Sequence, residues 1–377
     1  MIIRPIASSD LPALQQMAEE SGPGFTSLVR DKALLAEKIQ RSVDSFRSPV
    51  GRPGNETYLF ILEDPVSGEV MGISGIEASA GIQRPLYHFH KSQMVPGNRR
   101  PDTSDNYPPG NEVLKITSHY TGCTEICTLF LRPQFRRPNA GKLLSRVRFA
   151  FMAQHPERFS DTVIAEMRGV SSPDGSAPFW NWLRPHFADM DFTSVTRKVG
   201  AGDLDFIADH CPRHPLHTQL MSPEARAVIG QVHDRTRPAL SLLEAEGFRF
   251  RGYFDLFDAG PTVEATRSQV RSIAGSTECG VRIVDGRARI ADPLENPETP
   301  NQLLIANASS EQFRATMTDQ ATLHGRSGML EITPQLAESL RLGKGCRARV
   351  LEPVTAGADI ARRPTPNFHR EAGYAVL

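Results

Sequence analysis

The chain has 377 residues, enough for two domains of ordinary size, and its 43 basic and 43 acidic side chains cancel. This balance argues against a protein that holds nucleic acid or a membrane surface through bulk charge. Five scattered cysteines, and no apolar run that approaches about 18 residues, predict a cytoplasmic protein without disulfides, signal peptide or membrane span.

The predicted elements begin with a strand over residues 2–6 and a helix capped near Asp10. A glycine-rich loop, SGPGFTSL at residues 21–28, separates this helix from a second one over 31–46. The strand-like segments TYLFILED and VMGISGIEASA are joined by PVSGE, which predicts a hairpin. Residues 81–122 are rich in Pro, His, Asn and Tyr, and we expect a long excursion or an irregular extended segment there.

The centre of the chain contains the stretch EICTLFLRPQFRRPNAGKLLSRVRFAFM, residues 125–152, in which an apolar strand leads through three arginines into a helix. A strand (TVIAEMRGV), two helices (SAPFWNWLRPHF and TRPALSLLEAEGF) and another strand (RFRGYFDLFDAG) follow. Near residue 260 the pattern changes, because short strand candidates separated by Gly and Pro replace the longer elements. This spacing predicts a compact β-rich or barrel-like domain.

The helix start in RRPNAGKLL combines small residues with basic ones. The first turn of a helix offers unpaired N–H groups and the positive end of the helix dipole, and small residues let a phosphate approach them. The pattern is typical of a phosphate-binding site, although basic turns also occur on ordinary protein surfaces. The candidate residues are Arg136, Arg137, Asn139, Ala140, Gly141 and Lys142.

The order of these elements resembles the GNAT-type acyl-CoA N-acyltransferase superfamily, in which the pattern Arg/Gln-x-x-Gly-x-Gly/Ala holds the coenzyme A pyrophosphate. Arg136, Asn139 and Gly141 take those places here, and Asn in place of the first glycine is a mild departure, since Asn tolerates left-handed backbone angles. Over most of residues 1–275 the chain is similar to the arginine N-succinyltransferase family. The matching segments include IIRPIASSDLPAL, YLFILEDPVSGEVMGISGIEA, CTLFLRP, LLSRVRFAFMA, VIAEMRGV, HPLHTQLMSPEARAVIGQVH and LEAEGFRFRGYFDLFDAGPTVE.

This resemblance implies a fold and a division of the chain. The fold is α+β, with a mixed, mostly antiparallel sheet flanked by helices and a small C-terminal β-rich domain. We expect a GNAT-type acyltransferase domain over residues 1–260, a linker helix over 261–275, a small β-rich domain over 276–353 and a weakly structured tail over 354–377.

The resemblance also implies a reaction, the transfer of succinyl from succinyl-CoA to the α-amine of L-arginine, which is the first step of succinyl-dependent arginine catabolism. No permanently bound cofactor is expected. In the superfamily the strand before the phosphate loop splays from its neighbour, which implies that the backbones of Leu129 and Leu131 bind the acyl-CoA. His233, in IGQVHDRTRP, matches the proton donor of the family; without the resemblance it would be one of 11 histidines.

The residues that bind the charges of the substrate are less evident. Glu166 and Arg168 end a strand that should border the acyl channel, and Thr26 and Ser27 could close over the substrate. Structural functions are equally open, because the first two could pair on the sheet and Ser27 could cap a helix. The run HCPRHPLH gathers three histidines and a cysteine, but its prolines break the regular geometry of a ligand set, and we expect no metal site.

Two alternatives stay open at this point. One is a related acyl-CoA-dependent N-acyltransferase that acts on ornithine or another amine. The other is a non-catalytic acyl-CoA-binding sensor, in which His233 would have no purpose. The resemblance further implies L-arginine and succinyl-CoA as partners, and a homodimer or an assembly of paired subunits.

Overall fold

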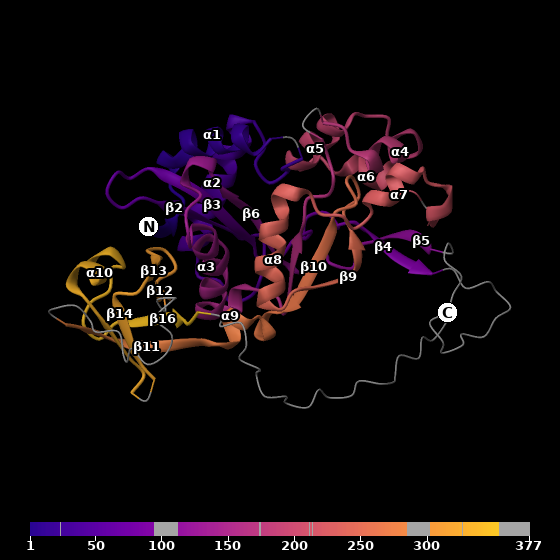
Figure 1. Ribbon diagram of the computed structural model, residues 1–377. Helices are drawn as coiled ribbons and strands as arrows, with labels where there is room; N and C mark the ends of the chain where they lie inside the picture. The colour runs from indigo at the N-terminus through magenta and orange to yellow at the C-terminus, as the bar shows by residue number, and fades with distance from the viewer. Residues whose placement is uncertain are drawn as a thin grey trace, which may run out of the picture.

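The computed structural model describes residues 1–22, 24–93, 112–172, 175–210, 212, 214–284, 302–325 and 327–353 (Figure 1). The tail predicted over 354–377 lies outside these ranges. Within the described residues the strands hydrogen-bond to one another in one continuous order. No helix of this part of the chain is both long enough and apolar enough to span a membrane.

The strands form a mixed sheet in which most neighbours are antiparallel. The parallel pairs among the described strands are β6 with β7 and β11 with β15. In spatial order the sheet contains β14 (Ala321–His324), β15 (Met329–Ile332), β11 (Ser276–Ile283), β16 (Arg347–Leu351), β12 (Leu303–Asn307), β13 (Ala315–Thr318), β1 (Ile2–Pro5), β2 (Thr57–Glu63), β3 (Val70–Glu77), β6 (Thr124–Leu131), β7 (Thr162–Glu166), β10 (Pro261–Thr266), β9 (Arg249–Phe254), β4 (His88–Gln93), β5 (Glu112–Thr117) and β8 (Leu216–His217).

Helices cover both faces of this sheet, which confirms the predicted α+β class. They are α1 (Leu11–Ser21), α2 (Lys32–Arg47), α3 (Ala140–Gln154), α4 (Pro178–Phe187), α5 (Phe192–Gly200), α6 (Asp205–His210), α7 (Pro223–Val228), α8 (Arg237–Glu246), α9 (Arg271–Ala274) and α10 (Pro334–Ser339). In Figure 1, α1 and α2 lie together over the N-terminal strands, and α4 to α7 gather at the opposite end of the molecule.

Strand β2 shows how the sheet separates two helical layers. Its residues Tyr58, Phe60 and Leu62 belong to the core cluster that includes the apolar side chains of α3. Leu59 and Ile61, between them, belong to the cluster that includes the apolar side chains of α1 and α2. Successive side chains of a strand point to opposite faces, so β2 is buried on both sides.

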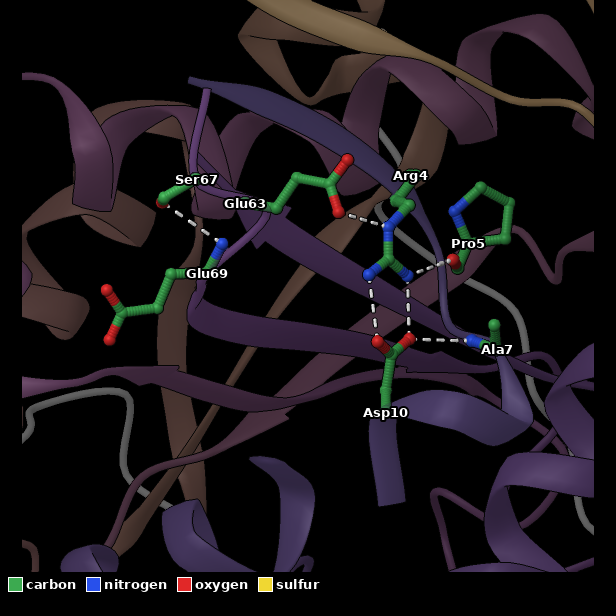
Figure 2. A network of polar contacts seen from close by, with 7 residues as sticks. All are labelled: Arg4, Pro5, Ala7, Asp10, Glu63, Ser67 and Glu69. Atoms are coloured by element: carbon green, nitrogen blue, oxygen red, sulfur yellow. Dashed lines mark hydrogen bonds and ion pairs between the residues drawn. The ribbon is translucent and has the colours of Figure 1, made fainter. Parts of the chain in front are cut away.

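An arginine–carboxylate network joins β1 to the start of α1 (Figure 2). Arg4 donates to both carboxylate oxygens of Asp10, at 2.6 and 2.8 Å, and to Glu63 of β2 at 2.5 Å. Asp10 also accepts the backbone N–H of Ala7 at 2.8 Å. Burial lowers the pKa of Arg4, but the hydrogen bonds and charges of the two carboxylates outweigh burial and raise it above the usual value. The network ties β1 to its neighbouring strand and to the following helix.

The prediction of a linker helix over 261–275 is wrong for the first half of that segment. Residues Pro261–Thr266 form β10, which pairs with β7 on one side and with β9 on the other. A helix begins later, as the four-residue α9. The β-branched residues Thr262 and Val263 suit a strand, and pairing on both edges decides their conformation.

The segment predicted over 81–122 contains two strands. β4 and β5 pair antiparallel over six residue positions, from His88↔Thr117 to Gln93↔Glu112. Residues 94–111, between them, lie outside the described residues. The segment thus extends the sheet beyond β9, to which β4 also pairs.

The C-terminal strands continue the same sheet. β13 pairs with β1 where Ala315 lies opposite Ile3. Phe313, just before β13, is fully buried, and its ring centroid lies 5.5 Å from that of Phe60 and 5.2 Å from that of Phe151. The C-terminal strands therefore share a core with the N-terminal part, and the domain boundaries given above remain a prediction.

Candidate active site

Strands β6 and β7 meet at one end and diverge at the other. Among the described residues, their parallel pairing is confined to Thr124↔Val163 and Glu125↔Ile164. β6 nevertheless continues to Leu131 and stays paired with β3 along its other edge. The two strands therefore form a fork, with Glu125 at its apex.

A cavity of about 730 Å³ occupies this fork. Residues 125–131 of β6 line one wall, and residues 165–168, at the end of β7 and just after it, line the other. Loop residues 24–27 and side chains of α5 and α8 also line the cavity, which reaches Gly141 at the start of α3. Its size is typical of ligand pockets, which hold roughly 300–1,000 Å³.

A β-bulge on β6 bends the strand where it borders the cavity. The register between β3 and β6 shifts between Ile73 and Gly75, opposite Thr128, whose φ of 53° lies in the left-handed region. Such an angle strains a β-branched residue and persists only where the surroundings impose it. A Cβ on Gly75 would lie 3.3 Å from the Thr128 hydroxyl, so glycine leaves room for the bulge.

The predicted coenzyme A residues are brought together around the mouth of the cavity, but only some of them line it. Asn139 has a φ of 67° and its side chain donates to Gln302 at 2.6 Å, so it does not cap α3. Arg137 lies 3.5 Å from the Asp64 carboxylate, and a Cβ on Gly141 would meet open space. Leu129, Leu131, Arg136 and Gly141 line the cavity, whereas Arg137, Asn139, Ala140 and Lys142 are not among its lining residues.

His233 lies against the cavity wall. Its backbone N–H donates to the carbonyl of Arg168 at 2.9 Å, and its Nδ1 accepts the backbone N–H of Arg235 at 3.1 Å. Burial lowers the pKa of the imidazole, and the charges of Arg168 and Arg235 lower it further. His233 itself is not among the lining residues, although Arg235 and Thr236 are.

The four residues proposed to bind the substrate all line the cavity: Thr26, Ser27, Glu166 and Arg168. The Arg168 guanidinium donates to the Ser171 hydroxyl at 2.9 Å, and its buried Nε has no hydrogen-bond partner. Glu166 lies 2.7 Å from Nε2 of the buried His88. Ser27 does not cap the following helix, since Asp31 accepts both N–H groups at the start of α2.

Four acidic residues of the cavity wall were missed in the sequence: Glu20, Glu125, Asp255 and Asp258. Burial raises the pKa of Glu125 well above its usual value, and repulsion from Glu166 and Glu77 adds to this effect. Burial likewise raises the pKa values of Asp255 and Asp258. No sequence signal marked these residues, because their approach depends on the packing of elements that are distant in the sequence.

Asp258 has a structural function that accounts for two glycines. It accepts the backbone N–H groups of Gly169 and Gly260, both at 2.8 Å. A Cβ on Gly260 would lie 2.0 Å from the Met167 carbonyl oxygen, so this position requires glycine. The close approach fixes the wall that follows β7. Among the described residues, no group of three or more His, Cys, Asp or Glu could hold a metal ion.

Comparison with known proteins places the chain in a family. Residues 1–272 match the family model described as the arginine N-succinyltransferase beta subunit. The arginine N-succinyltransferases of Citrobacter koseri and Shigella sonnei are 36% and 38% identical, and each alignment covers 93% of this chain and 97% of the relative.

A solved structure shows the same fold. The arginine/ornithine succinyltransferase subunit AI from Pseudomonas aeruginosa superposes with a TM-score of 0.80 at 32% identity, over 94% of this chain and 99% of that one. This match confirms the expected α+β, GNAT-type fold. The chain is therefore an acyltransferase that belongs to the arginine N-succinyltransferase family.

Proposed function

We propose that the protein transfers the succinyl group of succinyl-CoA to the α-amine of L-arginine, giving N2-succinyl-L-arginine and CoA. The observation that carries this proposal is the cavity in the fork of β6 and β7, which brings acidic and basic side chains to one wall of a chain from this family. A thioester and an amine held together there would react without a covalent intermediate on the protein.

The coenzyme A would bind at the start of α3. Its pyrophosphate would lie over the backbone of residues 137–142, where a helix N-terminus, Gly141 and nearby basic side chains favour an anion. The pantetheine arm would then follow β6 into the fork, beside the backbones of Leu129 and Leu131. The bulge at Thr128 supports this assignment, because it turns backbone groups of β6 away from the β3 ladder.

The reaction must move one proton from nitrogen to sulfur. The amine attacks the thioester carbonyl, a C–N bond forms and the C–S bond breaks. We assign the removal of the amine proton to Glu125, since it lines the cavity and its raised pKa makes its carboxylate a stronger base than an ordinary one.

We assign stabilisation of the departing sulfur to His233. Because Nδ1 accepts the Arg235 N–H, the neutral ring carries its proton on Nε2. That N–H interacts with the Ser171 backbone carbonyl and would exchange this partner for the developing thiolate. The lowered pKa of the ring favours this neutral form.

The two ends of arginine need opposite charges. Glu166 offers a carboxylate to the guanidinium, and Arg168 offers an unpaired Nε to the α-carboxylate. The loop residues Thr26 and Ser27 would close over the amino acid. Lys38 donates to the Ser27 carbonyl at 3.1 Å and thereby holds this loop against α2.

Ornithine is the second candidate amine, and the name of the solved Pseudomonas aeruginosa relative, which includes ornithine, favours it. Initial rates with arginine, ornithine and lysine, each with succinyl-CoA and acetyl-CoA, would test both proposals. We expect the highest kcat/KM with arginine and succinyl-CoA. A higher value with ornithine would reverse the assignment, and an absence of turnover with every pair would favour the acyl-CoA sensor.

We also propose that the chain works as an oligomer. The matching family model is named for a beta subunit and the solved relative for a subunit AI, which supports a homodimer or paired subunits. Light scattering of the purified protein would measure its mass, and a value near 41.6 kDa, the mass of one chain, would contradict the proposal.

A further inference from the structure

Four arginines of the described residues line the cavity, Arg136, Arg148, Arg168 and Arg235, and only Arg148 is buried. It has no acidic partner within the described residues. Arg148 lies in the middle of α3, its side chain is 2% exposed, and it is among the residues that line the cavity. Its Nε donates to the carbonyl of Ser145 and its Nη2 to the hydroxyl of Ser145, both at 3.0 Å. Both partners are neutral and lie one turn back on the same helix. Among the described residues, Arg148 makes no ion pair and Nη1 makes no hydrogen bond.

The ionisable groups around Arg148 do not neutralise it. Glu246 is already bound to Arg146 at 3.4 Å and to the Ser272 hydroxyl at 2.6 Å. Cys127, on β6, is a neutral thiol, because burial raises its pKa to about 12. The guanidinium therefore stands as a buried cation beside a cavity.

An unpaired buried cation is expensive to maintain. An arginine is not deprotonated in proteins, and a buried charge without a partner destabilises the fold strongly. Burial does lower the pKa of Arg148, to about 10, but this value still leaves the side chain charged at neutral pH. A ligand that brings a carboxylate into the cavity would supply the missing partner.

The succinyl group ends in such a carboxylate. We infer that the Arg148 guanidinium binds the terminal carboxylate of succinyl-CoA and gives the cavity its preference for a succinyl group over an uncharged acyl group. This inference rests on the proposed function. We assign Arg148 to the carboxylate of the acyl donor, and not to that of the amino acid, because Arg148 lies on α3, the helix that begins at the proposed coenzyme A loop. Arg168, beyond β7 on the other wall, remains for the α-carboxylate of arginine.

The test compares two acyl donors with the full-length protein. Butyryl-CoA has a four-carbon acyl group like that of succinyl-CoA but ends in a methyl group. In Arg148→Met we expect kcat/KM for succinyl-CoA to fall by roughly 10²–10³-fold, and that for butyryl-CoA to change by less than about threefold. The unliganded variant should unfold at the same temperature as the parent or a higher one, because an unpaired buried charge has been removed.

Arg146→Met is the matched control on the same helix. Arg146 is buried, is bound to Glu246 and is not among the cavity-lining residues. Its loss should lower the unfolding temperature and leave the succinyl-to-butyryl ratio unchanged. Arg148→Lys keeps the charge and loses the planar fork, so its ratio should lie between those of the parent and Arg148→Met. It replaces the Met variant should that protein fail to fold.

Three results would overturn the inference. In the first, Arg148→Met loses the same factor with both donors. In the second, the ratio for Arg148→Lys, or for a folded Arg148→Met, equals that of the parent. In the third, the variant alters discrimination between arginine and agmatine, which lacks the α-carboxylate, and leaves the donor ratio intact. If the parent itself fails to turn over succinyl-CoA and arginine, the proposed function fails first, which distinguishes the two failures.

Discussion

The His233 ring interacts with the backbone at two places, Arg235 and Ser171. Nδ1 accepts the N–H of Arg235 at 3.1 Å. This hydrogen bond caps the short helical turn Asp234–Thr236 that precedes α8. Replacement by Asn keeps an acceptor at this cap and removes the second nitrogen. We expect His233→Asn and His233→Ala to lower kcat by about 10²–10⁴-fold, with little change in KM for succinyl-CoA. Steady-state kinetics of proteins shown to be folded would measure this.

The control for His233 is its neighbour Asp234, whose side chain is 89% exposed and pairs with Arg237 at the surface. Asp234→Ala should keep kcat close to that of the parent. A folded His233→Asn protein with kcat within a few-fold of the parent would make His233 an ordinary capping residue.

Glu125 predicts a pH dependence. Its pKa is raised well above the ordinary carboxyl value, by burial first and then by Glu166 and Glu77. Below that pKa the side chain is protonated and cannot accept the amine proton. As the pH is lowered, kcat/KM should therefore begin to fall at a pH well above about 4.3, the usual pKa of Glu. Glu125→Gln should lower the rate and abolish this acid limb.

The variant Glu77→Gln tests whether the acid limb of kcat/KM comes from Glu125 or from another titrating group. Glu77 is not among the residues that line the cavity, and its charge helps to raise the pKa of Glu125. Its neutralisation should therefore move the acid limb to lower pH without removing it. A limb that stays in place in both variants would assign the titration to a different residue.

At the scale of elements, the start of α3 tests the coenzyme A site. A Cβ on Gly141 meets open space and its φ is not left-handed, so Gly141→Leu should fold at least as well as the parent. The added side chain would project at the cavity mouth, and we expect the KM for succinyl-CoA to rise by more than tenfold, roughly the effect of 1.4 kcal/mol, while the KM for arginine changes little. Gly51→Leu is the matched control, because Gly51 also has open space and is not among the cavity-lining residues.

Equal increases in the two KM values for Gly141→Leu would contradict this placement of the pyrophosphate.

The elements that could be predicted from the sequence are those with local signals. The β2–β3 hairpin follows from its turn and α3 from its small and basic first turn. The helix predicted over 31–46 is α2, but its cap is Asp31 and not Ser27. β10 was mistaken for a helix because Thr262 to Thr266 show no run long enough to separate strand from helix. One of its pairing strands, β9, ends only at Phe254, but the other, β7, is about 100 residues away in the sequence.

The site divides in the same way. His233 and the Gly141 loop were proposed from motifs and resemblance, and they stay predictions. Glu125 and Arg148 both stand in the stretch of residues 125–152 on which that resemblance depends, and neither was selected. Their neighbours decide their properties: Glu125 lies beside Glu166 of another strand, and Arg148 is buried in the cavity wall with only the neutral groups of Ser145 as hydrogen-bond partners. Local sequence contains neither fact.

One of the core clusters of the molecule crosses the predicted domain boundary. Phe313, from the C-terminal part, packs against Phe60 of β2 and Phe151 of α3, with ring centroids 5.5 and 5.2 Å apart. The backbone also crosses this boundary, since β13 pairs with β1 and the Ser310 hydroxyl donates to the Phe46 carbonyl at 2.8 Å. We therefore expect the two parts to unfold together.

The two tryptophans of the chain, Trp180 and Trp182, report on this coupling because both lie in α4, at the other end of the sheet from Phe313. Truncation of a fully buried Phe to Ala typically costs about 3–5 kcal/mol. In Phe313→Ala we expect tryptophan fluorescence and far-ultraviolet circular dichroism to show one shared transition, moved to lower denaturant by the same amount. Val66→Ala, at a side chain that is 94% exposed, should leave both curves in place. If the circular dichroism shifted in Phe313→Ala while the fluorescence transition stayed at its parent midpoint, residues 276–353 would unfold as a separate domain, and the contacts of Phe313 would join two cores instead of completing one.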